Sequence, residues 1–164
     1  MTFAYAKRSS CDYAWPMTAA LAVAVGGLLA LLGSFGDWAV CSTTPCYVPD
    51  DALAGMAFSE MSGVEFGYGI VTAIAATYLI AFGIYARRRG GGTSRSGTFA
   101  ILLSLLVLGT VSGFLIRFLA LWDESFTIWG PPAYGAVLVA SGGLLSLAAS
   151  VLMRRGTSNR DALM

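Results

Sequence analysis

Hydrophobic residues fall into four long runs, separated by shorter segments in which polar residues and glycine collect. The runs cover residues 17–35, 68–86, 98–122 and 132–153. Each is close to the length of about 20 residues that a helix needs to cross the hydrocarbon core of a bilayer. Pro16 precedes the first run and Pro132 opens the fourth, and proline is favoured in the first turn of a helix. The pattern therefore predicts an all-α membrane protein, a four-transmembrane-helix bundle forming a single domain over residues 1–164.

Composition supports this prediction and argues against several functions. Of the 164 residues, 57% are hydrophobic and 12% are charged, whereas soluble domains carry about 25% charged residues. Histidine is absent, which removes the commonest metal ligand and general base. No nucleophile–base pair or close carboxylate pair lies within a run, so we expect no enzyme, cofactor or metal. The basic residues form short clusters without aromatic partners, which argues against nucleic acid.

The basic residues predict the orientation of the chain. Nine of the ten lie before the first run, between the second and third, or after the fourth: Lys7, Arg8, Arg87, Arg88, Arg89, Arg95, Arg154, Arg155 and Arg160. Short loops rich in Lys and Arg stay in the cytoplasm. The opposite loops carry seven acids: Asp37, Asp50, Asp51, Glu60, Glu65, Asp123 and Glu124. We therefore expect two antiparallel hairpins in a cell membrane, with cytoplasmic termini and an outer loop over 36–67. Trp38, Tyr85 and Tyr134 lie near the ends of runs, as interfacial aromatic residues do.

The first run has an alternative interpretation as a secretory signal peptide, because Lys7 and Arg8 precede it. Cleavage requires small residues near the end of the run. The segment Phe35-Gly36-Asp37-Trp38 does not offer a good cleavage site, because only Gly36 is small. We therefore interpret the run as the first membrane span.

Two cysteines in the outer loop are candidates for a disulfide. Cys41 and Cys46 are separated by four residues that include Pro45. The compartment outside the membrane is oxidising, and a turn at the proline can bring the two Cα atoms within disulfide distance. A redox or metal pair is the alternative, but no further ligand of a suitable type lies near in the sequence. Cys11 is expected on the cytoplasmic side as a free thiol.

Arg117 is the one charged residue in the interior of a run, five residues before Trp122. Charges within membranes are costly and are usually paired or functional. One interpretation is that its guanidinium reaches the outer headgroups and pairs with Asp123, Glu124 or Glu65. The others are a contact with an anionic lipid headgroup, a quinone or a substrate, or with a partner protein.

Small residues in the third run are candidates for helix packing. Gly109 and Gly113 form a GxxxG motif, which lets two helix backbones approach closely in lipid. Packing inside the bundle is the favoured interpretation, and a dimer interface is the alternative.

Two segments outside the runs have patterns of their own. Residues 52–62 have apolar positions at helical spacing, which predicts a short helix in the outer loop. Residues 90–97 are rich in glycine and serine, which is typical of a flexible linker.

Three short motifs carry a resemblance to known proteins. Gly36-Asp37-Trp38 ends the first run, a Ser-Gly-hydrophobic-acid-x-Gly-x-Gly pattern covers 62–69, and arginine clusters close both hairpins. From about residue 17 to 153 the chain resembles small prokaryotic four-span membrane proteins of unknown function, which implies a prokaryotic cell membrane and no particular activity. It is also similar to claudin-like proteins in architecture, with Trp38 before Cys41 and Cys46, although the Gly-Leu-Trp of that family is missing.

The function expected from these features is contact with other membrane components. Coupled transporters need ionisable groups near the bilayer midplane and broken helices, and the runs show neither. We expect a non-catalytic accessory or structural subunit of a larger membrane protein complex, surrounded by lipid and acting through helix packing and the acidic outer loop. The alternative is a small homo-oligomeric channel or carrier.

The expected topology can be tested by labelling single cysteines in a background in which the three native cysteines are serine. In intact cells, a cysteine at position 50 should react with a membrane-impermeant thiol reagent, because the first outer loop faces outward. Cysteines at positions 93 and 158 should react only after the membrane is permeabilised. Labelling at position 93 in intact cells would overturn the topology.

Overall fold

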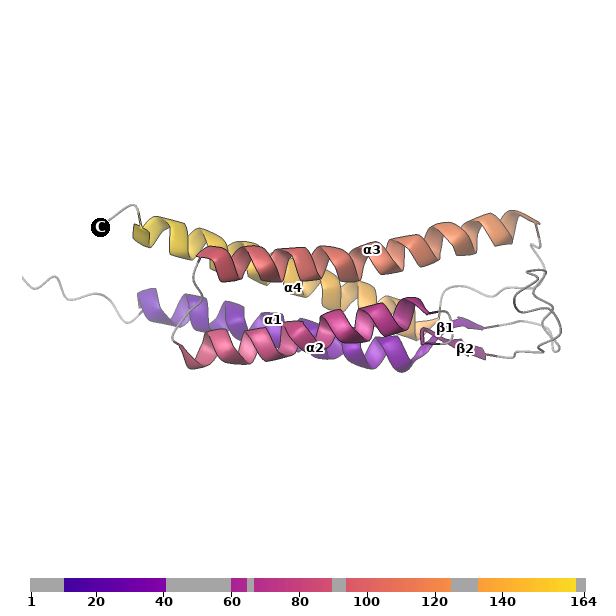
Figure 1. The fold of residues 1–164 in the computed structure, drawn as a ribbon, viewed down its shortest axis with the longest axis horizontal. Helices are drawn as coiled ribbons and strands as arrows, with labels where there is room; N and C mark the ends of the chain where they lie inside the picture. Colours follow the sequence, from indigo (N-terminus) through magenta and orange to yellow (C-terminus); the bar gives the residue numbers. More distant parts are fainter. Residues whose placement is uncertain (1–10, 41–59, 65–66, 90–93, 125–132, 162–164) are drawn as a thin grey trace, which may run out of the picture.

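Four helices form the body of the protein (Figure 1). The computed structural model describes residues 11–40, 60–64, 67–89, 94–124 and 133–161. The helices are α1 (Cys11–Phe35), α2 (Tyr68–Arg88), α3 (Ser94–Glu124) and α4 (Tyr134–Asp161). Each contains a stretch long and apolar enough to cross a membrane: Met17–Phe35, Tyr68–Arg88, Gly97–Arg117 and Tyr134–Arg155. The prediction of four helices that are long and apolar enough to cross a membrane is confirmed.

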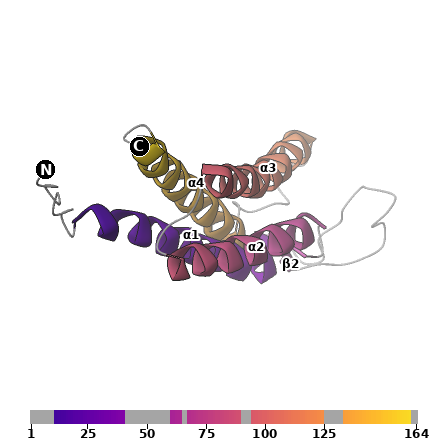
Figure 2. The same ribbon diagram turned by 60° about the vertical axis from the view of Figure 1, so that its left-hand side comes forward.

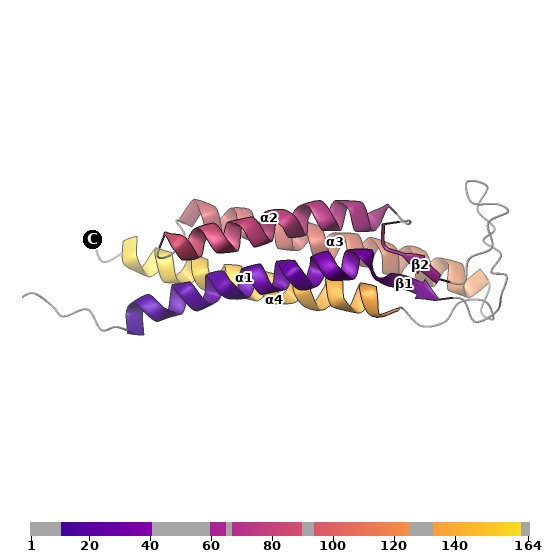
Figure 3. The ribbon, with the colours of Figure 1, turned by 90° about the horizontal axis from the view of Figure 1, so that it is seen from below.

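The helices pack as two layers, with α1 and α2 in one and α3 and α4 in the other (Figure 2). Helix α1 has the most extensive contacts, with α4 and with α2, and α3 packs on α4 and α2. Figure 3 shows α1 alongside α4. The end of α1 lies near the beginning of α4 (Figure 3).

The helices are longer than the apolar runs from which they were predicted. Helix α1 begins at Cys11, so Pro16 is its sixth residue and the expectation that this proline occupies the first turn is wrong. Helix α3 begins at Ser94, so the second half of the predicted linker is helical. Helix α4 begins at Tyr134 and continues to Asp161. Hydropathy detects the segment in contact with lipid, whereas backbone hydrogen bonds continue a helix into polar sequence.

A two-stranded antiparallel sheet was not predicted from the sequence. Strand β1 (Asp37–Val40) pairs with β2 (Glu60–Ser62), with Asp37 opposite Ser62. The predicted short helix over 52–62 is therefore wrong at its end, where residues 60–62 are a strand, and its residues 52–59 lie outside the described residues. The sheet pairs the segment that follows α1 with the segment that precedes α2.

Helix α1 lies at backbone contact distance from its two neighbours. A Cβ atom added at Gly26 would be 2.6 Å from the carbonyl oxygen of Gly142 in α4. One added at Gly83 of α2 would be 2.7 Å from the carbonyl oxygen of Ala20. The same close approach occurs at Gly27 with Ala76, and at Gly33 with Gly135. Glycine thus allows these helices to pack more closely than any side chain would permit.

Hydroxyl groups inside the bundle have hydrogen-bond partners. The Ser146 hydroxyl of α4 donates to the carbonyl oxygen of Val23 in α1 at 3.3 Å, and the Thr72 and Thr110 hydroxyls are 2.8 Å apart between α2 and α3. Among the described residues, no buried side-chain nitrogen or oxygen atom lacks a partner. Large apolar side chains such as Leu32, Ile74 and Leu144 are exposed, as the lipid-facing surface of a membrane protein requires.

Candidate functional site

Trp38 occupies the interior of the bundle at the end where the two strands lie. Its side chain has no solvent exposure, although it follows α1 by only three residues. The indole Nε1–H donates to the carbonyl oxygen of Gly33 at 2.8 Å. The ring meets Phe114 of α3 edge to face, with centroids 5.0 Å apart, and Phe114 in turn contacts Tyr68 of α2. Trp38 therefore connects α1 with α3, and through Phe114 with α2.

Backbone from the segment before α2 lies against the indole at Gly63. The Gly63 amide donates to the carbonyl oxygen of Gly36 at 3.1 Å, and the Gly69 amide donates to that of Gly63 at 2.7 Å. A Cβ atom at Gly63 would collide with Nε1 of Trp38. Gly67 has a φ of 76°, a left-handed conformation that glycine adopts without steric cost. The glycines of the motif over residues 62–69 thus let the chain pass against the tryptophan ring at Gly63 and turn at Gly67 before it enters α2.

The beginning of α4 completes this arrangement. The Ala133 amide donates to the carbonyl oxygen of Trp38 at 3.1 Å. A Cβ atom at Gly135 would be 2.7 Å from the carbonyl oxygen of Asp37. Segments far apart in the sequence therefore meet around residues 36–38, and we call Gly33, Gly36, Trp38, Gly63 and Phe114 the tryptophan cap.

The tryptophan cap offers packing and backbone hydrogen bonds rather than reactive groups. The only acid whose side chain is described there, Asp37, is half-buried. No group of three or more His, Cys, Asp or Glu residues in the described part of the chain could hold a metal ion. The geometry of the cap indicates that its role is to hold the helix ends together.

A second candidate site is the face of α3 that no other helix of this chain covers. Its residues are spaced at alternating intervals of three and four and are all exposed: Leu102, Leu105, Gly109, Ser112, Ile116 and Leu119. Ile116 is 71% exposed. We call these six residues the open face of α3. Its centre consists of two small residues, flanked on both sides by large aliphatic ones.

Of the two glycines of the GxxxG motif, Gly109 is exposed, whereas Gly113 is half-buried. A Cβ atom added at Gly109 would have no neighbour within 4 Å, and one at Gly113 would meet only Tyr68, at 3.7 Å. Gly109 is exposed because α3 turns its other side toward α2 and α4. Close backbone contacts are instead made by the glycines of α1, α2 and α4, which do not form a GxxxG motif.

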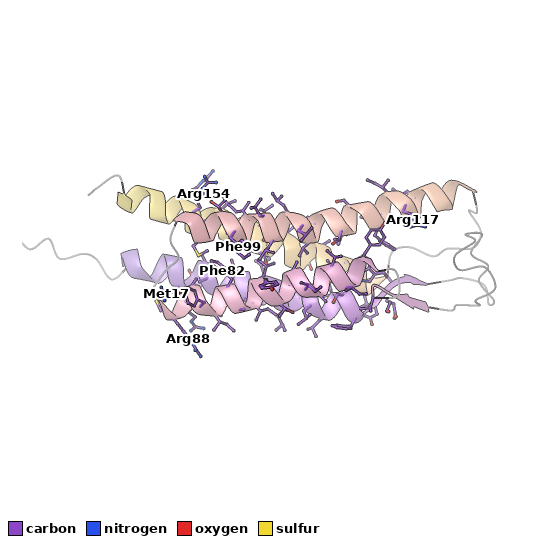
Figure 4. The ribbon with its side chains drawn as sticks, viewed as in Figure 1. Met17, Phe82, Arg88, Phe99, Arg117 and Arg154 are labelled. Carbon is purple, nitrogen blue, oxygen red and sulfur yellow. The ribbon has the colours of Figure 1, made fainter. Side chains whose placement is uncertain are left out.

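Arg117 is an exposed residue of α3 that interacts with another group in the chain. It lies toward the end of the bundle that carries the strands, whereas Arg88 and Arg154 lie toward the opposite end (Figure 4). Asp123 and Glu124 belong to α3, but their side chains lie outside the described residues, as do Glu65, Cys41 and Cys46 entirely. The ion-pair and disulfide expectations therefore stay predictions.

Sequence reasoning misassigned Trp38 by placing it among interfacial residues, whereas Tyr85 and Tyr134 are indeed exposed. The available signal was the pair of short motifs at 36–38 and 62–69. These two motifs meet in the tryptophan cap, which explains why both consist of glycines next to larger residues.

Comparisons with protein-family models, with curated proteins and with solved structures gave no match. The resemblance to small prokaryotic four-span proteins therefore stays a prediction.

The tryptophan cap predicts a large effect of one substitution. Trp38→Ala should lower the free energy of unfolding in detergent by about 3–5 kcal/mol, because it removes a fully buried ring and leaves a cavity. Phe35→Ala is the matched control, since Phe35 is 64% exposed three residues away. Equal effects of the two substitutions would show that the indole does not hold the bundle together.

Proposed function

We propose that this protein is a non-catalytic accessory subunit of a larger membrane protein complex, and that the open face of α3 is its contact surface. The observation that carries the proposal is the exposure of Gly109. Among the helical glycines whose surroundings the structure describes, every other one would bring an added Cβ atom within 4 Å of another group. A glycine in the interior of a helix costs about 1 kcal/mol relative to alanine, and close packing of another helix would offset that cost.

The spacing of the open face supports a helical partner. Intervals of three and four residues are those of two helices that pack side chains into one another's gaps. The face extends from Leu102 to Leu119, which at 1.5 Å per residue is about 26 Å, close to the roughly 30 Å of the hydrocarbon core. Helices associate in lipid by van der Waals packing at small residues, and Gly109 and Ser112 lie at the middle of the face.

The topology that accompanies this proposal is a pair of antiparallel hairpins with both termini in the cytoplasm of a prokaryotic cell. The exposed Arg87, Arg88, Arg154 and Arg155 at one end support it, because basic residues are retained on the cytoplasmic side. The opposite end would then present the acidic outer loop as a second docking surface for the partner complex.

A large side chain in place of Gly109 on the open face of α3 tests the proposal. With the protein tagged and solubilised in mild detergent, we expect a larger polypeptide to co-purify at a fixed ratio. Gly109→Leu should weaken that association by about tenfold, which corresponds to about 1.4 kcal/mol, because the leucine side chain would keep the partner helix away. The thermal stability of the protein should not fall, since a Cβ atom added at Gly109 has no neighbour within 4 Å among the described residues.

Thr77→Leu on α2 is the matched control, because it also places leucine at a small exposed position of a membrane helix. The proposal is wrong if Gly109→Leu and Thr77→Leu retain the partner equally well. A discrete homo-oligomer that conducts ions in liposomes would support the alternative of a small channel or carrier.

A further inference from the structure

The end of the bundle opposite the strands is densely basic. Seven arginines belong to the helix ends there: Arg87, Arg88, Arg89, Arg95, Arg154, Arg155 and Arg160. The helical acids at this end are Asp12 and Asp161. All five of the arginines whose side chains are described (87, 88, 89, 154 and 155) are exposed. This end therefore carries a strong positive charge.

The arginines at the end of α2 point in different directions. Arg87 and Arg88 are the last residues of α2, so their side chains leave the helix axis about 100° apart, and Arg89 follows directly after the helix. All three are exposed, although Ala86, the residue before them, is buried with Ala19, Ala20 and Met153. Arg88 and Arg154 point away from the bundle on opposite sides (Figure 4). Positive charge is thus available around the bundle rather than on one side.

These side chains lie at the level of the lipid headgroups. The membrane-spanning stretches of α2 and α4 end at Arg88 and Arg155. Tyr85, one turn before the end of α2, is 52% exposed, and the Arg89 guanidinium lies 4.6 Å from the centroid of its ring. Tyrosine prefers the interface between hydrocarbon and headgroups, so the arginines next to it reach the phosphate layer.

We propose that this basic end binds anionic phospholipids, whose headgroup phosphates pair with Arg87, Arg88 and Arg155. A guanidinium forms two parallel hydrogen bonds with a phosphate and remains charged at any physiological pH. The end of α2 carries only about half a negative charge from the helix dipole, which its three arginines outweigh. The occupant is a lipid rather than a soluble anion, because the bilayer already places phosphates at this depth.

The test uses purified protein in vesicles of phosphatidylcholine and phosphatidylglycerol, with spin-labelled forms of either lipid to measure the fraction held at the protein surface. We expect the wild-type protein to hold phosphatidylglycerol in preference to phosphatidylcholine. In the triple variant Arg87→Gln, Arg88→Gln, Arg155→Gln, the preference for phosphatidylglycerol over phosphatidylcholine should fall by about fivefold or more. One basic residue near the membrane surface alone contributes a factor of about five to the binding of anionic lipid.

The variant with lysine at the same three positions separates charge from structure. It should keep most of the preference, because attraction to anionic headgroups depends mainly on the positive charge. Equal retention of both lipids by the wild-type protein would overturn the proposal, and so would an unchanged preference in the glutamine variant. Inorganic phosphate that displaces phosphatidylglycerol completely would show a site for soluble anions and would also overturn it.

Discussion

The close approach of helix backbones along α1 is the constraint on which the rest of the structure depends. Lipid is as apolar as the side chains of the bundle, so burial of hydrophobic surface cannot hold these helices together. What remains is van der Waals contact and hydrogen bonding, both of which require short distances. Gly26 and Gly33 bring α1 to the backbone of α4, and Gly83 brings α2 to α1. The Ser146 hydroxyl can reach a carbonyl oxygen of α1 because Gly26, which faces it, has no side chain.

The tryptophan cap and the open face of α3 follow from this arrangement. With α2 and α4 held against α1, the segments that leave α1 and enter α2 must meet at one end, where Trp38 fills the space between them. Helix α3 contacts the bundle largely through residues larger than glycine, such as Val107 and Phe114, both of which are buried. Its glycine and serine at 109 and 112 stay on the outside. Small residues therefore pack helices inside this chain, and at positions 109 and 112 we propose that they contact a partner.

Much of the fold could be predicted from the sequence, because hydropathy over about 20 residues is a direct consequence of bilayer thickness. The positions of the four spans followed from that alone. The contacts between helices could not be predicted, since GxxxG spacing does not say which way a helix faces, and Gly109 faces outward. Trp38 was assigned to the interface because tryptophan near a span end usually lies there. Its burial depends on Gly63 and Phe114, which are distant in the sequence.

The most direct test replaces two glycines of the bundle, Gly142 and Gly109, with alanine. It asks whether each substitution raises or lowers the free energy of unfolding. Without steric contact, glycine to alanine within a helix stabilises by up to about 1 kcal/mol. Gly142→Ala should instead lower the free energy of unfolding by about 1–3 kcal/mol, because its methyl group would meet the backbone of α1 at Gly26 and Ala30. Gly109→Ala, in an open position, should leave the monomer equally stable or more stable. The measurement is equilibrium unfolding of the purified protein in the same detergent micelles, and equal shifts of the same sign for both variants would contradict the account.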